Sequence, residues 1–189
     1  EILSGLVGSE MCIRDSLRSD KILQSFPGAD RAAIQAYEQA WQTRFSDGYK
    51  AFLARSNGLR FGFDFDQAHR AGVSPALADM NTFFGIGNGN PHLDLALLTP
   101  KMGFHNRAFL PFAPVLGLGG DFCTYVEISQ GTHQGRIMYT DGEMASEYED
   151  LDIRGQDVDT LVDGFIDDGW FMPVAASFDD LIRLYAKMA

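Results

Sequence analysis

The sequence predicts an α+β fold: a single domain with a mostly antiparallel central sheet, flanked by N-terminal helices and a C-terminal helix. Near both ends of the chain, apolar residues recur at three- and four-residue steps, as in amphipathic helices. The middle of the chain carries short alternating or β-branched runs typical of strands. Helices followed by strands and then helices favour the α+β class. At 189 residues, the chain can bury a sizeable core in one domain.

Two helices are expected before the first strand. The first covers residues 29–45, with Asp30 at its positively polarised N-terminal end. The second runs from a Ser46 cap through Arg55, and Asn57-Gly58 is expected to end it because both residues tolerate the left-handed conformation. The apolar faces are Ile34, Tyr37, Trp41 and Phe45 in the first helix, and Tyr49, Phe52 and Leu53 in the second.

Residues 59–101 are expected to contain two strands separated by loops or short helices. Residues 59–65 alternate apolar with polar or small residues and predict a strand. Residues 66–81 are expected to be loop or briefly helical, and residues 82–86 to form a second strand. The composition of 87–91 predicts a loop, and 92–101 leaves room for a short helix. The core face of the first strand would be Leu59, Phe61, Phe63 and Phe65.

A further group of strands is predicted in the second half. Residues 109–113 suggest a short strand, with Pro111 at an edge or a strand start. Residues 116–121 are interpreted as a glycine-rich turn. The aromatic and β-branched run at 122–128 is a strong strand, and 136–140 is its hairpin partner.

Two helices are expected after the strands. One has Asp157 and Asp159 at its start and ends at Gly169. The last begins at Ser177, and Asp180 three residues later imitates a capping box. Their apolar stripes are Leu161, Val162, Phe165 and Ile166 in the one, and Phe178, Leu181, Ile182 and Tyr185 in the other.

Negative charge is concentrated in one stretch. Between Asp141 and Asp180 there are thirteen acidic residues and one basic residue, Arg154, a net charge of −12 in a chain whose total is −11. Such a surface repels nucleic acid and anionic membranes, and it attracts basic proteins or cations. The expected partner is therefore a protein, with no nucleic acid and no membrane involved; the oligomeric state stays open.

The first sixteen residues are interpreted as lying outside the native domain. Glu10 to Ser16 resembles a translated transposon-end adapter from sequencing libraries, so residues 1–16 are interpreted as a non-native scar and 17–189 as the domain. Residues 1–16 should then make few core contacts. With Cys12 set aside, the lone Cys123 supports no disulfide or zinc site and is expected to be a buried thiol in a reducing, cytoplasmic setting.

Catalytic and cofactor signatures are not found in the sequence. Residues 157–164 resemble a calcium-binding loop, but Leu161 stands where an oxygen ligand is needed. Residues 150–155 also resemble such a loop, but Arg154 puts a positive charge where a ligand should be. Gly85 to Gly89 lacks the spacing of a phosphate-binding loop. We therefore expect no enzyme activity, no cofactor and no metal. The histidines have no metal-binding spacing; they are His69, His92, His105 and His133.

Four short motifs occur in order over residues 29–189. They are Tyr49–Leu53 followed by Asn57-Gly58, then Leu110–Ala113 followed by Gly119–Cys123, then Gly135–Tyr139, and finally Ala175–Leu181. In this order they resemble the SUKH superfamily, which includes the fungal Smi/Knr cell-wall synthesis regulators and many bacterial immunity proteins. The resemblance implies an α+β fold with helices around a central sheet, and action by protein binding without catalysis.

The resemblance and the charge together predict a non-enzymatic protein-binding module. The favoured reading is a bacterial immunity protein that neutralises a cognate toxin, often a nuclease, through an acidic surface. The alternative is a regulatory or scaffold protein of the Smi/Knr type without a toxin partner. Whether the acidic stretch binds a partner or only aids solvation stays open. The residues proposed to bind the partner are Asp157, Asp159, Asp163, Asp167, Asp168 and Trp170.

Overall fold

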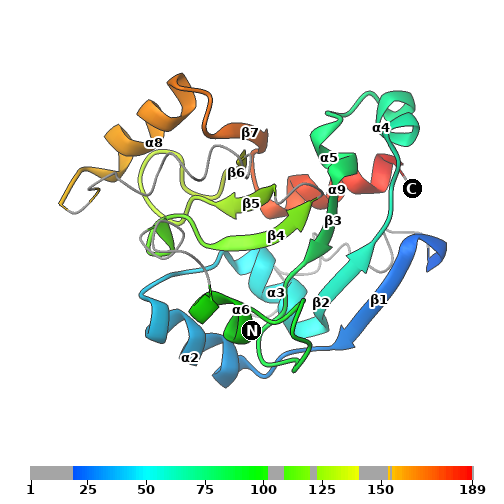
Figure 1. Ribbon diagram of the computed structural model, residues 1–189, viewed down its shortest axis with the longest axis horizontal. Helices are drawn as coiled ribbons and strands as arrows, with labels where there is room; N and C mark the ends of the chain where they lie inside the picture. The colour runs from blue at the N-terminus through cyan, green and yellow to red at the C-terminus, as the bar shows by residue number, and fades with distance from the viewer. Residues whose placement is uncertain (1–18, 102–108, 120–122, 141–152, 154, 189) are drawn as a thin grey trace, which may run out of the picture.

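The computed structural model describes residues 19–101, 109–119, 123–140, 153 and 155–188 (Figure 1). Within these residues seven strands form one antiparallel sheet, in which each strand pairs with the next along the chain. The predicted α+β class is confirmed. The strands are β1 (Ile22–Pro27), β2 (Ser56–Phe61), β3 (Met80–Phe83), β4 (Val115–Gly119), β5 (Thr124–Glu127), β6 (Ile137–Thr140) and β7 (Met172–Ala175).

The helices flank the sheet (Figure 1). The predicted caps are confirmed: the Asp30 carboxylate accepts from the Ala32 amide, and the Ser46 hydroxyl accepts from the Tyr49 amide. The helices are α2 (Arg31–Trp41), α3 (Asp47–Arg55), α4 (Phe65–Ala71), α5 (Ala76–Asp79), α6 (Leu95–Leu98), α8 (Val158–Asp167) and α9 (Phe178–Met188), with short 3-10 turns η1 (Ser19–Lys21) and η2 (Thr99–Lys101).

Aromatic side chains hold α3 and α9 against β2 and β3. The ring centroid of Phe178 lies 5.1 Å from that of Tyr49 and 5.5 Å from that of Phe83. The Tyr185 ring lies 5.1 Å from the Phe61 ring. All five side chains are buried. Such edge-on pairs add about 0.5–1.5 kcal/mol each beyond the area they bury, so this cluster fixes both helices to the sheet.

Helix α3 ends at Arg55, as predicted, but Asn57-Gly58 is not its stop signal. Both residues lie inside β2, which begins directly after the helix. The buried Asn57 amide joins β2 to the main chain of Ile86: its Nδ2 donates to the Ile86 carbonyl at 2.8 Å, and its Oδ1 accepts from the Ile86 amide at 2.6 Å. Gly58 has a φ of 98° and lies beside Asn88 and Gly85, so it serves a close approach of two segments.

Phe65 was predicted to lie on the core face of a strand, and this prediction is wrong. Its side chain is 60% exposed, and it is the first residue of α4. The strand ends earlier because Asp64 and Gln67 form a reciprocal capping box, which starts a helix at this point. Leu59 and Phe61 are buried as expected, and Phe63 is half-buried.

Residues 109–113 do not form the predicted strand, because the amides of Phe112 and Ala113 both donate to the Phe109 carbonyl in a helical turn. The predicted turn at 116–121 is also wrong, since Val115–Gly119 is β4. A Cβ on Gly117 would collide with the Thr82 carbonyl of β3, so this glycine permits two strands to approach closely.

The remaining expectations have mixed outcomes. The predicted hairpin of 122–128 with 136–140 is confirmed as β5 and β6, and Cys123 is buried, as expected. Residues 1–16, interpreted as a scar, lie outside the described residues. Within the described part of the chain, no helix combines the length and apolarity needed to cross a membrane.

Candidate partner-binding surface

Helix α8 carries the described part of the acidic stretch that precedes β7. Its N-cap Asp157 accepts hydrogen bonds from the amides of Asp159, at 2.9 Å, and Thr160, at 3.4 Å. Apolar side chains on the opposite side hold the helix in place, and Phe165 packs edge-on against Phe109 and Phe171, with ring centroids 5.6 and 5.2 Å apart. The predicted helix and its start are confirmed. Its buried residues are Leu161, Val162 and Phe165.

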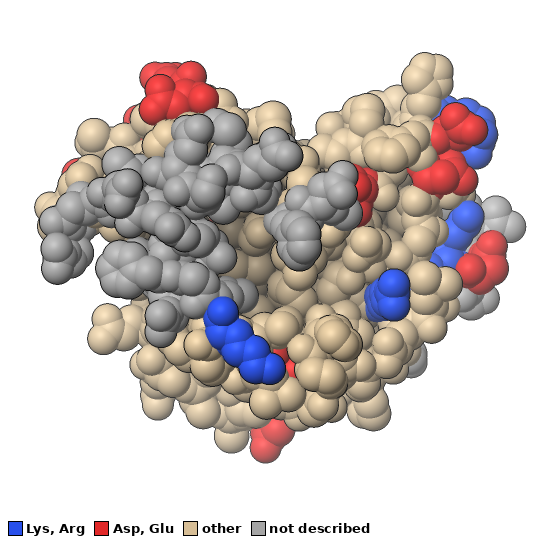
Figure 2. Space-filling model, in the orientation of Figure 1, with Lys and Arg blue, Asp and Glu red and all other residues tan. Residues whose placement is uncertain are grey.

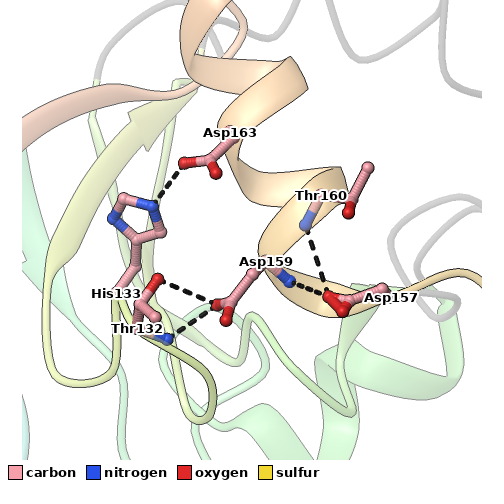
Figure 3. A network of polar contacts seen from close by, with 6 residues as sticks. All are labelled: Thr132, His133, Asp157, Asp159, Thr160 and Asp163. Carbon is pink, nitrogen blue, oxygen red and sulfur yellow. Dashed lines mark hydrogen bonds and ion pairs between the residues drawn. The ribbon is translucent and has the colours of Figure 1, made fainter.

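Two aspartates of α8 bind the loop between β5 and β6 (Figure 3). Asp159 Oδ1 accepts from the Thr132 amide at 2.7 Å and from the Thr132 hydroxyl at 3.1 Å. Asp163 Oδ1 lies 2.7 Å from His133 Nε2, in a loop thirty residues earlier in the chain. Hydrogen bonds to charged groups stabilise more than neutral ones. The two carboxylates therefore fix the orientation of α8 relative to the hairpin.

Gly131 makes this docking possible. Its φ is 81°, and a Cβ at this position would collide with Asp159 Oδ1. We predict that Gly131→Ala lowers the free energy of unfolding by about 2–4 kcal/mol, through backbone strain and displacement of the Asp159 carboxylate. Urea denaturation measures the loss. The matched control is Gly155→Ala, since Gly155 has a φ of 75° but no atom of the described residues lies within 4 Å of the added Cβ. Equal losses in the two variants would disprove the role of the Asp159 contact.

The C-terminal end of α8 carries exposed carboxylates. Asp167 and Asp168 are exposed there, and the last turn contains no basic residue. Figure 2 shows acidic atoms over this end of the helix, at the upper left of the view. Carboxylates at a helix C-terminus face the negative end of the helix dipole, which costs about 0.3–1 kcal/mol each. Gly169, with a φ of 77°, then ends the helix as predicted.

The proposed binding residues thus fall into separate groups. Asp157 caps its own helix, and Asp159 and Asp163 bond the β5–β6 loop; Asp163 nevertheless keeps 64% of its side chain exposed. Asp167 and Asp168 have no hydrogen bond or ion pair to another described side chain. The other acidic residues of 141–152 lie outside the described residues.

Trp170 is half-buried beside this end of α8. Its ring is stacked on Phe165, with centroids 5.2 Å apart and an interplanar angle of 27°. Its main-chain amide donates to the Phe165 carbonyl at 2.7 Å. These contacts give the C-terminal end of α8 a fixed apolar neighbour next to two exposed carboxylates. Protein interfaces combine a core enriched in aromatic residues with a polar rim, and Trp170 beside two exposed carboxylates matches that combination.

Glu127 is a notable acidic residue that the sequence analysis did not single out. It ends β5 and is 1% exposed. Its Oε2 accepts from the Ser46 amide at 3.0 Å, and burial raises the pKa of the carboxyl. The available signal was one acidic residue between Val126 and Ile128 in a predicted strand, because a charge at such a position is rarely buried without a partner.

The other displaced pKa values belong to core tyrosines. Burial raises the pKa of Tyr37 to about 12 and that of Tyr49 and Tyr185 well above the ordinary value. Tyr49 and Tyr185 donate their hydroxyl hydrogens to the carbonyls of Phe84 and Leu77, at 2.7 and 2.9 Å. These hydroxyls therefore serve the core. Within the described residues, no three His, Cys, Asp or Glu side chains gather in a way that could hold a metal ion.

Comparison with known proteins gives the family. No curated protein matches the chain. The family model described as the SMI1 / KNR4 family (SUKH-1) matches residues 28–183, which span α2 to the first half of α9. That range contains all four motifs on which the resemblance to the SUKH superfamily was based, and it covers most of the described structure. The chain therefore belongs to the SMI1 / KNR4 family (SUKH-1).

Proposed function

We propose that this chain is a non-enzymatic protein-binding module of the immunity type, which acts in the cytoplasm of its producing cell. Its partner is a basic protein, such as a nuclease toxin, whose positive surface it occupies. Membership of the SMI1 / KNR4 family (SUKH-1) supports a binding role. The net charge of −12 between Asp141 and Asp180 supports a basic partner.

The observation that carries the proposal is the pair Asp167 and Asp168 at the C-terminal end of α8. Both are exposed and stand where the helix dipole disfavours negative charge. Local rules of this kind are most often broken at functional sites, where binding compensates for lost stability. A basic side chain of a partner, placed at this end, would be attracted both by the carboxylates and by the helix dipole.

The internal bonds of Asp159 and Asp163 support the same role indirectly. They hold α8 on the β5–β6 hairpin, so the carboxylates at its far end are presented on a fixed element. A preorganised surface loses less conformational entropy on binding. The charges would speed encounter and select the partner, while Trp170 and its neighbours would supply apolar contact.

The test is Asp167→Lys, measured by stopped-flow association with the product of the adjacent gene once that product is shown to bind the wild-type chain. We expect the association rate constant to fall by about tenfold at low salt, because electrostatic steering is reversed locally. The stability of the free chain should rise by about 0.3–1 kcal/mol, since a cation suits a helix C-terminus. This opposition between binding and stability is specific to the proposal.

The matched control is Asp66→Lys, which makes the same charge change on the exposed face of α4. The control should leave the association rate within about twofold of wild type, because α4 is remote from α8 in the fold (Figure 1). If both variants slow association equally, only net charge matters and α8 is not the binding surface. If the chain binds its partner but does not protect cells from that partner's toxicity, the regulatory reading of the family replaces the immunity reading.

A further inference from the structure

A pocket separate from the acidic end of α8 lies between the N-terminus of α3 and the β5–β6 hairpin. Its volume is about 190 Å³, whereas one water molecule needs only about 10–15 Å³. The exposed residues Arg44, Asp47 and Gln134 line its mouth. The buried residues among its lining are Phe45, Glu127 and Ile128. The pocket therefore has room for a group of several atoms and a carboxyl group in its wall.

The Glu127 carboxyl is only partly satisfied within the fold. Its Oε2 accepts from the Ser46 amide at 3.0 Å, but no described group forms a hydrogen bond with the buried Oε1. A carboxylate can accept several hydrogen bonds, and leaving one of its oxygens buried without a donor costs free energy. Burial also raises the pKa of this carboxyl, in spite of the opposing effects of Ser46 and Lys50.

One nearby cation of the chain, Lys50, is already engaged in an ion pair. Lys50 Nζ lies 3.0 Å from Glu38 Oε1, and that same oxygen accepts from the Phe45 amide at 2.8 Å. Lys50 therefore influences Glu127 only through its charge. Asp47 adds a second negative charge at the mouth, against one positive charge on Arg44. No described hydrogen bond joins Arg44 to Glu127, so a donor from outside the chain would complete the hydrogen bonding of this carboxyl.

We propose that this pocket binds the cationic end of a lysine or arginine side chain from another protein, with the Glu127 carboxylate in its wall accepting the N–H group. A charged N–H donor fits because it both completes the hydrogen bonding of the carboxyl and stabilises its ionised form. The pocket volume accommodates a guanidinium or ammonium group with part of its aliphatic stem. The buried Phe45 and Ile128 would contact that stem.

The test uses methylguanidinium chloride as the probe and the full chain as the receptor. Amide NMR follows Ser46 and Gly135 during titration, with sodium chloride added to keep ionic strength constant. Saturable shifts are expected with methylguanidinium and not with its neutral analogue methylurea. Glu127→Gln should lower the affinity for methylguanidinium by about tenfold or more, the range expected for a lost charge-assisted hydrogen bond. This test requires no partner, so its outcome is independent of the binding role proposed for α8.

Two further variants sharpen the result. Asp66→Asn removes a carboxylate from α4, far from the pocket, and should leave probe affinity unchanged. Arg44→Gln removes a like charge from the mouth, so affinity should stay equal or rise. The proposal is overturned if methylguanidinium gives no saturable shift, if methylurea binds equally well, or if Glu127→Gln binds the probe as wild type does. It is also overturned if Arg44→Gln weakens binding, since Arg44 would then form part of the site.

Discussion

Replacing Asn57 with alanine is expected to lower the free energy of unfolding by about 2–4 kcal/mol. The Asn57 side chain donates to the Ile86 carbonyl and accepts from the Ile86 amide, at 2.8 and 2.6 Å. Alanine would leave both main-chain groups of Ile86 without these partners, and the two residues are 5% and 3% exposed. Each buried group left unsatisfied costs about 1–3 kcal/mol. The loss should exceed that of an ordinary surface substitution.

Chemical denaturation of Asn57→Ala and Asn57→Asp separates the two hydrogen bonds. An ionised aspartate can still accept from the Ile86 amide but cannot donate to the Ile86 carbonyl. Its loss of stability should therefore contain one lost hydrogen bond and the cost of a buried charge. Asn90→Ala is the control, because the Asn90 side chain accepts from the exposed His92 amide in the same loop region. A loss in Asn57→Ala no greater than that in Asn90→Ala would show that the bridge to Ile86 is dispensable.

The helices were predictable because their signals are local. Asp30, Ser46 and Asp157 cap helices within three residues of their own positions, and apolar stripes at helical spacing identify the buried faces. No partner distant in the sequence is needed to read these signals. The confirmed positions of α3, α8 and α9 follow from this kind of information, whereas α2 ends at Trp41, so that Phe45, predicted on its apolar face, lies beyond the helix.

The strands were less predictable because their reasons lie elsewhere in the chain. The glycines of β4 suggested a turn, but Gly117 is required by the carbonyl of Thr82 on the neighbouring strand. No strand was predicted at β1 or β7, which contain Pro27 and Pro173, although an edge strand accepts proline. Pairing between distant segments overrides such local signals.

The candidate surface was predictable only as a concentration of charge. The sequence treats Asp159, Asp163 and Asp167 alike, yet the first two are bonded to Thr132 and His133 and the third is exposed at a helix end. Their roles differ because the β5–β6 loop, nearly thirty residues away in sequence, packs beside the N-terminal half of α8. Composition alone carries no information on that contact.

Glu127→Gln is expected to change how stability depends on pH. Burial raises the pKa of Glu127 in the folded chain, so the unfolded chain loses this proton first as pH rises. Below the ordinary glutamate pKa both states are protonated, and the favourable contribution of the carboxyl is fully present. As pH rises through the folded pKa that contribution is lost, so wild type loses stability relative to the variant by up to about 1.4 kcal/mol per pH unit. Denaturation of both proteins between about pH 4 and 8 measures the difference.

The direction of this slope distinguishes two opposing effects at one carboxyl. Desolvation favours the protonated form, whereas the Ser46 hydrogen bonds and the Lys50 charge favour the ionised form. Glu38 is bonded to Lys50 and weakens its influence, while Arg44 and Asp47 at the pocket mouth carry opposite charges. If wild type instead gained stability relative to Glu127→Gln as pH rises, the Ser46 hydrogen bonds and the Lys50 charge would outweigh desolvation. Gln134→Ala changes the pocket mouth without removing a titratable group. Its difference from wild type in the free energy of unfolding should therefore not depend on pH. A bound cation favours the ionised carboxyl, so methylguanidinium should flatten the slope of wild type and of Gln134→Ala, each measured relative to Glu127→Gln. A slope that methylguanidinium leaves unchanged in both proteins would show that the pocket does not admit the cation.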